Sequence, residues 1–134
     1  MILYIIRGHS GSGKTTLAIE LMKEMISKGA MVKDIICEAD GYFYTEEGDY
    51  NFDRDMLKEA HRWCQEKVRM KMKEKWSKIA VSNTFTRKWE YEPYVKMAKE
   101  HGYSVFILEC QNDFQNVHDV PEMVVRIQKE RMER

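Results

Sequence analysis

Apolar residues are arranged along this chain in two alternating patterns. Short continuous apolar runs, which predict buried strands, lie at residues 2–6, 34–39, 79–81 and 104–108. Apolar residues at helical spacing follow each run, at residues 14–28, about 54–76, 88–101 and from 121 onward. Strands that alternate with helices predict an α/β fold, in which helices cover both faces of a parallel sheet.

The first apolar run leads directly into a glycine-rich segment, Gly8-His9-Ser10-Gly11-Ser12-Gly13-Lys14-Thr15-Thr16. The segment matches the pattern G-x-x-x-x-G-K-[ST] at every fixed position, with the strand before it and the helix after it that the mechanism needs. Glycines let the backbone turn tightly and point N–H groups at phosphate oxygens, and the following helix adds the positive end of its dipole. Residues 8–16 are therefore predicted to bind a nucleoside triphosphate.

Two side chains of this segment have expected roles at the phosphates. We expect Lys14 to reach the β- and γ-phosphates and the hydroxyl of Thr15 to bind Mg²⁺. The alternative interpretation is a Gly/Ser-rich turn that only joins a strand to a helix. The loop by itself does not distinguish kinases, GTPases and motors, because all of them share it.

Charge and length limit the classes of partner. The 134 residues predict one domain over 1–134, and Lys+Arg and Asp+Glu are equal at 22 each, so contact with a polyanion needs a local basic patch. The second half of the long helix, about 67–78, is rich in lysine and arginine. It is either a solvated helix face or a track for a phosphate backbone.

The cysteines and the first residues of the chain indicate the cellular compartment in which the protein is expected. Cys37, Cys64 and Cys110 are odd in number and show no metal-binding spacing, which predicts reduced, mostly buried thiols. The opening apolar run is too short for a signal peptide or a membrane span. We therefore expect a cytoplasmic protein without a membrane partner.

Residues that follow the strands are the candidates for chemistry, because ligands of open α/β sheets bind beyond the carboxyl ends of the strands. These residues are 8–15, Asp40, Ser82-Asn83-Thr84 and 109–119. Asp40 is the carboxylate placed to act as a base on an acceptor hydroxyl. The alternative for Asp40 is a simple Asx turn before Gly41.

Several blocks together resemble one family. They are R-G-x-x-G-S-G-K-T-T at 7–16, A-D-G-Y-F at 39–43, A-H-x-W-C at 60–64, V-S-N-T-F-T-x-x-W-E at 81–90, P-Y at 93–94, G-Y at 102–103 and N-V-H-x-V-P at 116–121. Over nearly the whole chain, this combination is similar to the small P-loop proteins related to phage polynucleotide kinase. The resemblance implies a three-layer P-loop kinase-type fold with a sheet ordered 2-3-1-4, ATP with Mg²⁺, and Asp40 as the catalytic base.

The chain departs from the family pattern at three places. Ser82 stands where relatives commonly have an aspartate, and Phe85 stands where they often have an asparagine. Residues 100–125 contain no lysine or arginine, although such kinases bring arginines over the transferring phosphate. His118, Arg126 and Arg87 are the candidates to replace them, and His118 is equally interpretable as a packing residue.

The expected function is a phosphotransferase that moves the γ-phosphate of ATP to a hydroxyl of a polynucleotide 5′ end, a nucleotide or a modified base. Asp40 would be its base and Lys14 its electrostatic clamp. Tyr42, Phe43, Tyr44 and Tyr50 lie in the loop after Asp40 and could stack on a base, although core packing explains some of these aromatic residues more simply. The alternative is a non-catalytic or weakly hydrolytic ATP-binding module that regulates a partner.

Overall fold

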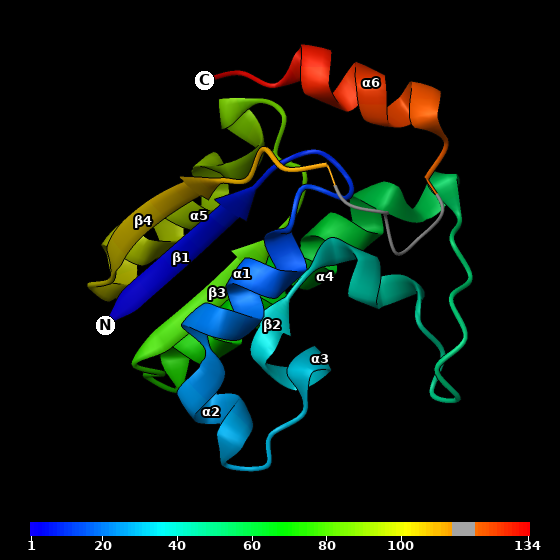
Figure 1. The fold of residues 1–134 in the computed structure, drawn as a ribbon. Helices are drawn as coiled ribbons and strands as arrows, with labels where there is room; N and C mark the ends of the chain where they lie inside the picture. The colour runs from blue at the N-terminus through cyan, green and yellow to red at the C-terminus, as the bar shows by residue number, and fades with distance from the viewer. Residues whose placement is uncertain (114–119) are drawn as a thin grey trace.

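The computed structural model describes residues 1–113 and 120–134. Within these residues, the strands form one sheet in the order β2-β3-β1-β4, and all paired strands are parallel (Figure 1). The strands are β1 (Ile2–Arg7), β2 (Ile36–Cys37), β3 (Lys78–Ser82) and β4 (Ser104–Glu109). The predicted α/β class and the 2-3-1-4 order are confirmed.

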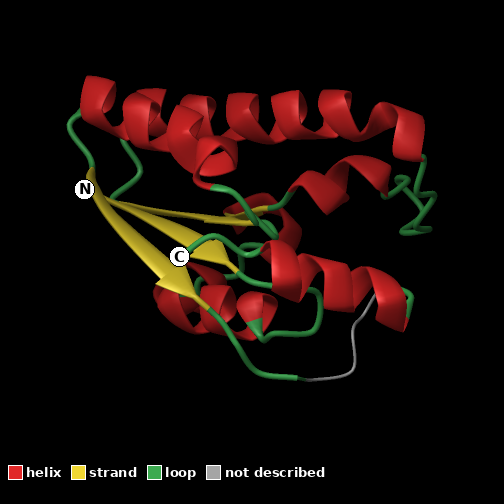
Figure 2. Cartoon of the chain, turned by 90° about the horizontal axis from the view of Figure 1, so that it is seen from above, coloured by secondary structure: helices red, strands yellow, loops and turns green. Residues whose placement is uncertain are grey.

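Helices lie on both sides of the sheet (Figure 2). They are α1 (Lys14–Leu21), α2 (Lys23–Ser27), α3 (Val32–Ile35), α4 (Leu57–Lys73), α5 (Lys88–His101) and α6 (Glu122–Arg131), with short 3-10 helices η1 (Ala39–Phe43) and η2 (Arg54–Met56). One buried cluster joins the sheet to α1, α2 and α3, and a larger cluster joins it to α4 and α5. Across the described ranges, no helix combines the length and apolar character needed to cross a membrane.

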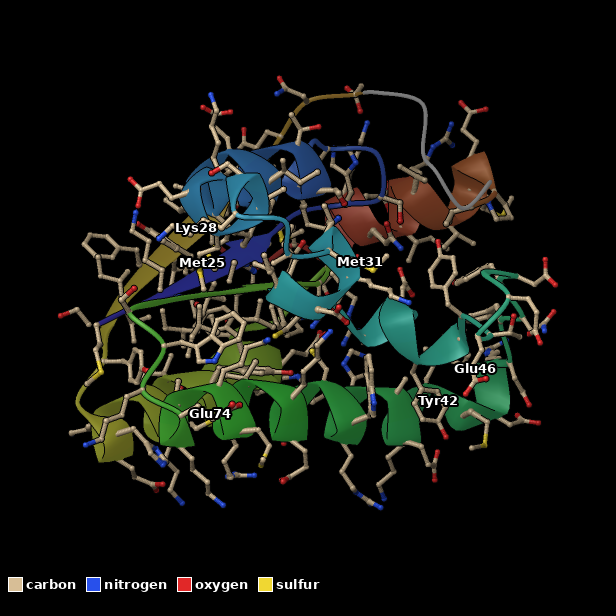
Figure 3. The ribbon with its side chains drawn as sticks, turned by 90° about the horizontal axis from the view of Figure 1, so that it is seen from below. Met25, Lys28, Met31, Tyr42, Glu46 and Glu74 are labelled. Carbon is tan, nitrogen blue, oxygen red and sulfur yellow. The ribbon has the colours of Figure 1, made fainter. Side chains whose placement is uncertain are left out.

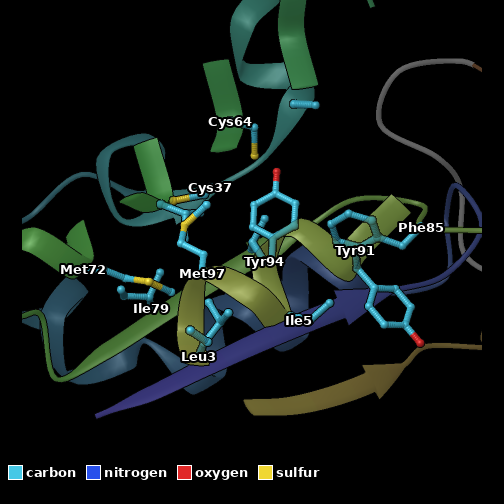
Figure 4. Close-up of a cluster of buried hydrophobic side chains, with 14 of the residues drawn as sticks. Leu3, Ile5, Cys37, Cys64, Met72, Ile79, Phe85, Tyr91, Tyr94 and Met97 are labelled. Atoms are coloured by element: carbon cyan, nitrogen blue, oxygen red, sulfur yellow. The ribbon is translucent and has the colours of Figure 1, made fainter. Parts of the chain in front are cut away.

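The larger cluster contains two of the three cysteines. Leu3 and Ile5 of β1 are fully buried there, and the hydroxyl of Tyr94 points toward Cys64 (Figure 4). Burial raises the pKa of the Cys37 thiol to about 12. Cys37 and Cys64 are buried and Cys110 is partly buried, and all three are free thiols, as predicted.

Two predicted elements differ from the observed ones. The helix predicted over 14–28 is divided at Met22, whose ψ of 15° departs from helical geometry while its side chain is buried against the sheet. The strand predicted over 34–39 is only Ile36–Cys37. It ends early because the N–H of Ala39 donates to the side chain of Asn83 at 2.8 Å instead of continuing the ladder.

The hydrogen bond between Ala39 and Asn83 leads to a prediction about the stability of the fold. Replacing Asn83 with alanine removes the acceptor of the buried Ala39 N–H, and we expect a loss of about 1–3 kcal/mol in the free energy of unfolding. Urea denaturation followed by circular dichroism measures it. Asn51→Ala, at an exposed position, serves as the control, and equal stability of the two variants would contradict the assigned role.

Pro93 lies inside α5, five residues after Lys88, the first residue of the helix. A proline here removes the hydrogen bond that would reach the carbonyl of Trp89. Trp89, whose carbonyl loses this bond, is 69% exposed.

The basic half of the long helix contributes to packing. Lys67 and Lys71 of α4 donate to the carbonyls of Lys33 and Asp34 in α3, at 2.5 Å each. Lys71 is 5% exposed and lies 3.7 Å from the ring centre of Trp76. These two lysines hold the last turn of a short helix, which favours a structural interpretation of the basic patch over a track for nucleic acid.

Candidate nucleotide site

The glycine-rich segment 8–16 connects β1 to α1 at the carboxyl edge of the sheet. Gly13 has a φ of 99°, which favours glycine, and directly precedes the first residue of α1. A Cβ atom on Gly8 would lie 2.6 Å from the carbonyl oxygen of Cys110. Backbone conformation at one position and close packing at the other therefore explain why these residues are glycines.

The first turn of α1 has no negative group of its own. No side chain caps its N-terminus, no acidic residue lies in its first turn, and Lys14 adds a cation where the helix dipole is already positive. Ser12 is 1% exposed, and its hydroxyl oxygen has no hydrogen-bond partner in the described part of the chain. An uncapped helix start, a cation and an unpartnered buried hydroxyl fit a bound phosphate anion.

The side chain of Lys14 bends back over the segment. Its Nζ donates to the carbonyls of Gly8 at 2.9 Å and His9 at 3.0 Å. Burial lowers the pKa of Lys14, and the charges of Glu38, Cys110 and Asp40 act in the opposite direction. Two carboxylates that follow β2 thus lie within electrostatic reach of this amine.

Thr15, the predicted Mg²⁺ ligand, contacts one of these carboxylates. Its Oγ1 donates to Oε1 of Glu38 at 3.2 Å. A hydroxyl and a carboxylate beside a phosphate loop suit Mg²⁺, which takes oxygen ligands and usually completes its shell with phosphate oxygens and waters. Within residues 1–113 and 120–134 no group of three or more His, Cys, Asp or Glu side chains could hold a metal alone, so the phosphates would supply further ligands.

Sequence reasoning overlooked Glu38, because it considered only residues after the strand end. The alternation of side chains between the two faces of the sheet could have identified Glu38. Ile36 packs in the cluster beneath α1, whereas Cys37 packs in the cluster beneath α4. Since side chains alternate along a strand, Glu38 faces the same side as α1.

Asp40 lies in η1, two residues after Glu38. The contact from Ala39 to Asn83 fixes the backbone directly before it. Gly41, directly after it, packs so closely on α4 that a Cβ atom would lie 3.0 Å from the Trp63 ring. Burial and the charge of Asp40 raise the pKa of Tyr50 to about 12, and a hydrogen bond with Asp40 contributes.

Aromatic side chains are frequent in the loop that follows Asp40, and they pack on aromatic neighbours. Tyr42 packs edge-on against Trp63, with ring centres 6.0 Å apart, and Tyr50 stacks with Phe52 at 6.5 Å. Figure 3 shows Tyr42 and Glu46 at the opposite end of the molecule from Met25 and Lys28. Tyr44 and Phe52 are 45% and 51% exposed, whereas Phe43 is buried, so the loop is part core and part accessible aromatic surface.

Arg7 organises the loop after β3. It is 3% exposed and donates through Nε and Nη2 to the carbonyl of Phe85, at 3.0 and 2.8 Å. Phe85 has a φ of 44°, a conformation that asparagine adopts more readily than phenylalanine. The position at which the family resemblance leads us to expect asparagine is therefore one of positive φ.

Helix α6 packs across the carboxyl edge of the sheet (Figure 1). The backbone N–H of Ser10 donates to Oε1 of Gln128 at 2.8 Å, a contact between residues 118 positions apart. Arg131 donates to Oγ1 of Thr86 at 2.9 Å, and Arg134 pairs with Glu109 at 2.9 Å. The helix and the residues after it are thereby attached to the phosphate loop, to the loop after β3 and to the end of β4.

The residues predicted to replace the missing arginines over the transferring phosphate have different outcomes. His118 lies outside the described residues. Arg87 directly precedes α5, Arg126 lies on α6, and both are exposed. In the described part of the chain, neither makes a hydrogen bond or ion pair with the phosphate loop, so their predicted role stays a prediction.

The side chain of His9 lines a cavity together with Lys129 of α6. Its Nδ1 lies 2.9 Å from the carbonyl of Ser10, and its Nε2 lies 3.6 Å from a carboxylate oxygen of Asp113. The cavity has a volume of about 230 Å³ and is also lined by Cys110 and Met132. Of the predicted binding set, His9 and Ser10 thus contact the α6 side, Thr15 contacts Glu38 directly after β2, and the amine of Lys14 contacts the loop itself.

Together, the parallel 2-3-1-4 sheet and the loop from β1 to α1 define a P-loop kinase-like α/β protein. The sequence profile of an AAA domain family matches residues 3–119, and the chain belongs to this family. NEDD4-binding protein 2 of Homo sapiens is 37% identical over 109 residues, which are 81% of this chain and 6% of that protein. The chain therefore corresponds to a small part of that relative.

Solved structures show the same fold. A putative kinase from Chloroflexus aurantiacus superposes with a TM-score of 0.59 at 14% identity, covering 81% of this chain and 57% of the other. The Mycobacterium tuberculosis APS kinase CysC in complex with AMPPNP and APS superposes with a TM-score of 0.56 at 18% identity, covering 82% and 62%. At these identities the likeness establishes the fold alone.

Proposed function

We propose that the chain is an ATP-dependent phosphotransferase that moves the γ-phosphate of ATP to a hydroxyl of a polynucleotide 5′ end, a nucleotide or a modified base. The observation that carries the proposal is that Lys14, at the start of α1, and Asp40, just after β2, lie at the same carboxyl edge of the parallel sheet. It combines a cation for phosphate and a carboxylate for an acceptor hydroxyl at one edge of the sheet.

The phosphate loop has the binding role in this proposal. Backbone N–H groups of residues 8–16 hold the phosphates of ATP, and Lys14 leaves its two carbonyl partners to contact the β- and γ-phosphates. Mg²⁺, when bound at Thr15, neutralises part of the phosphate charge. The 230 Å³ cavity beside His9 has room for further parts of the nucleotide.

Asp40 has the proton-transfer role. Its carboxylate accepts the proton of the acceptor hydroxyl while that oxygen attacks the γ-phosphorus, and the bond to the β–γ bridging oxygen breaks to release ADP. Asn83 supports this role by fixing the backbone of Ala39, next to Asp40.

The choice of acceptor rests on the resemblance to polynucleotide kinases and on the aromatic loop. Exposed Tyr44 and Phe52 lie in the same loop as Tyr50, which bonds to Asp40. Aromatic side chains next to a catalytic carboxylate suit an acceptor that carries a base, because bases stack on aromatic rings. The kinases of similar fold, one of them bound to AMPPNP, support ATP as the donor.

The test is transfer of labelled phosphate from γ-labelled ATP to 5′-hydroxyl oligonucleotides, nucleosides and nucleoside monophosphates. We expect a labelled product from at least one class. The absence of product from every class, with Mg-ATP bound tightly, would favour a non-catalytic ATP-binding module instead. That second function is supported by Ser82 and by the ion pairs that occupy Lys129, Arg131 and Arg134 on α6 and in the residues after it.

A further inference from the structure

The contact between Thr15 and Glu38 joins the first turn of α1 to the end of β2. From it we infer that Glu38 positions the Thr15 hydroxyl and a water of the bound Mg²⁺, a role that an aspartate at the end of β3 performs in other P-loop proteins. This inference rests on the proposed ATP site. It assigns the acidic role beside Mg²⁺ to Glu38, which follows β2, instead of to the residue at the end of β3.

The sheet register explains how a residue after β2 can take the role of a residue at the end of the neighbouring strand, β3. Ile36 is opposite Ala80 and Cys37 is opposite Val81, so the next pair along the two strands is Glu38 and Ser82. Ile36 and Ala80 belong to the cluster beneath α1, so Glu38 and Ser82, each two residues further on, also face α1. Glu38 keeps an extended backbone, with φ −136° and ψ 135°, which maintains the alternation.

Ser82 cannot perform the acidic role itself. It is 3% exposed, carries no charge and has a short side chain. The glutamate side chain is longer than that of aspartate, and it extends from the adjacent strand to the Thr15 hydroxyl, 3.2 Å away. The loss of a carboxylate at one strand end is thus matched by a carboxylate at the neighbouring one.

The direction of this hydrogen bond suits metal binding. The Thr15 hydroxyl donates its proton to Glu38, so the lone pairs of Oγ1 are available to a cation on the other side. Mg²⁺ retains several waters in such sites, and a carboxylate next to the hydroxyl can accept hydrogen bonds from them.

The experiment measures ATP affinity by titration calorimetry, with excess EDTA and with Mg²⁺, for the parent chain and for Glu38→Gln. The amide keeps the size of the side chain but removes its charge. We expect Glu38→Gln to bind ATP in EDTA as tightly as the parent or more tightly, because a negative charge near the phosphates is gone. We expect the tightening produced by Mg²⁺ to fall about tenfold, in line with the loss of an outer-shell partner.

Glu46→Gln, an exposed glutamate in the loop after η1, is the matched control and should retain the full effect of Mg²⁺. Binding of Mn²⁺ to the ATP complex, followed by electron paramagnetic resonance, gives a readout that does not depend on turnover. A full Mg²⁺ effect in Glu38→Gln, or equal weakening in EDTA and in Mg²⁺, would overturn the inference. A parent chain that does not bind ATP under either condition would instead overturn the proposed function.

Discussion

Replacing Lys14 with alanine is expected to lower the affinity for Mg-ATP by about 100-fold, which corresponds to about 2.7 kcal/mol of lost charge-assisted hydrogen bonding. The reason is that Lys14 supplies the cation nearest the loop, at a helix start that no side chain caps. Titration calorimetry with ATP and Mg²⁺ measures the loss. The fold should persist, because the amine contacts only two backbone carbonyls of the loop.

Lys23→Ala is the control for this variant. Lys23 lies on α2, is exposed and pairs with Glu20 at 3.8 Å, so its removal changes the net charge equally without touching the loop. The control should bind ATP like the parent chain. An unchanged affinity in Lys14→Ala would show that the loop does not hold a triphosphate and would remove the basis of the proposed function.

Replacing Asp40 with asparagine is expected to lower the rate of phosphoryl transfer by about 10²–10⁴-fold, the usual contribution of a positioned general base. The amide cannot accept the proton of the acceptor hydroxyl. Binding of Mg-ATP should change little, since the loop and Lys14 are intact. Single-turnover transfer of labelled phosphate measures the rate, and calorimetry measures the binding.

Asp49→Asn is the matched control, because Asp49 is an exposed carboxylate of the same loop whose backbone, not its side chain, makes the hydrogen bonds to Thr45. Transfer should continue at the parent rate in this control. If Asp40→Asn and Asp49→Asn transfer phosphate equally fast, Asp40 is not the base. The Asx-turn interpretation of Asp40 then becomes the better one.

The phosphate loop illustrates what could be predicted locally. Its glycines, Lys14 and Thr15 all lie within residues 8–15, and the positive φ of Gly11 and Gly13 is a local backbone requirement. The continuous apolar runs of β1 and β3 were equally clear, because a strand buried on both faces is apolar throughout. The order of the sheet came from the resemblance to a family, since apolar patterning does not state which strands pair.

The contacts around the loop could not be read in the same way. The division of the first helix at Met22 could not be predicted from the sequence, because no glycine or proline occurs there. The short β2 depends on where Asn83, 44 residues away from Ala39 in the chain, places its amide. These features arise from packing between distant segments, which local propensity does not encode.

By itself, the sequence determined that this chain has a phosphate loop between its first strand and first helix and an acidic residue, Asp40, after its second strand. Only the tertiary structure decided that Glu38 contacts Thr15 and that Gln128 contacts Ser10. The physical reason is that the motif is built from adjacent residues with fixed backbone demands, whereas the second set of contacts depends on strand register and helix packing. Those are settled only when the whole sheet has formed.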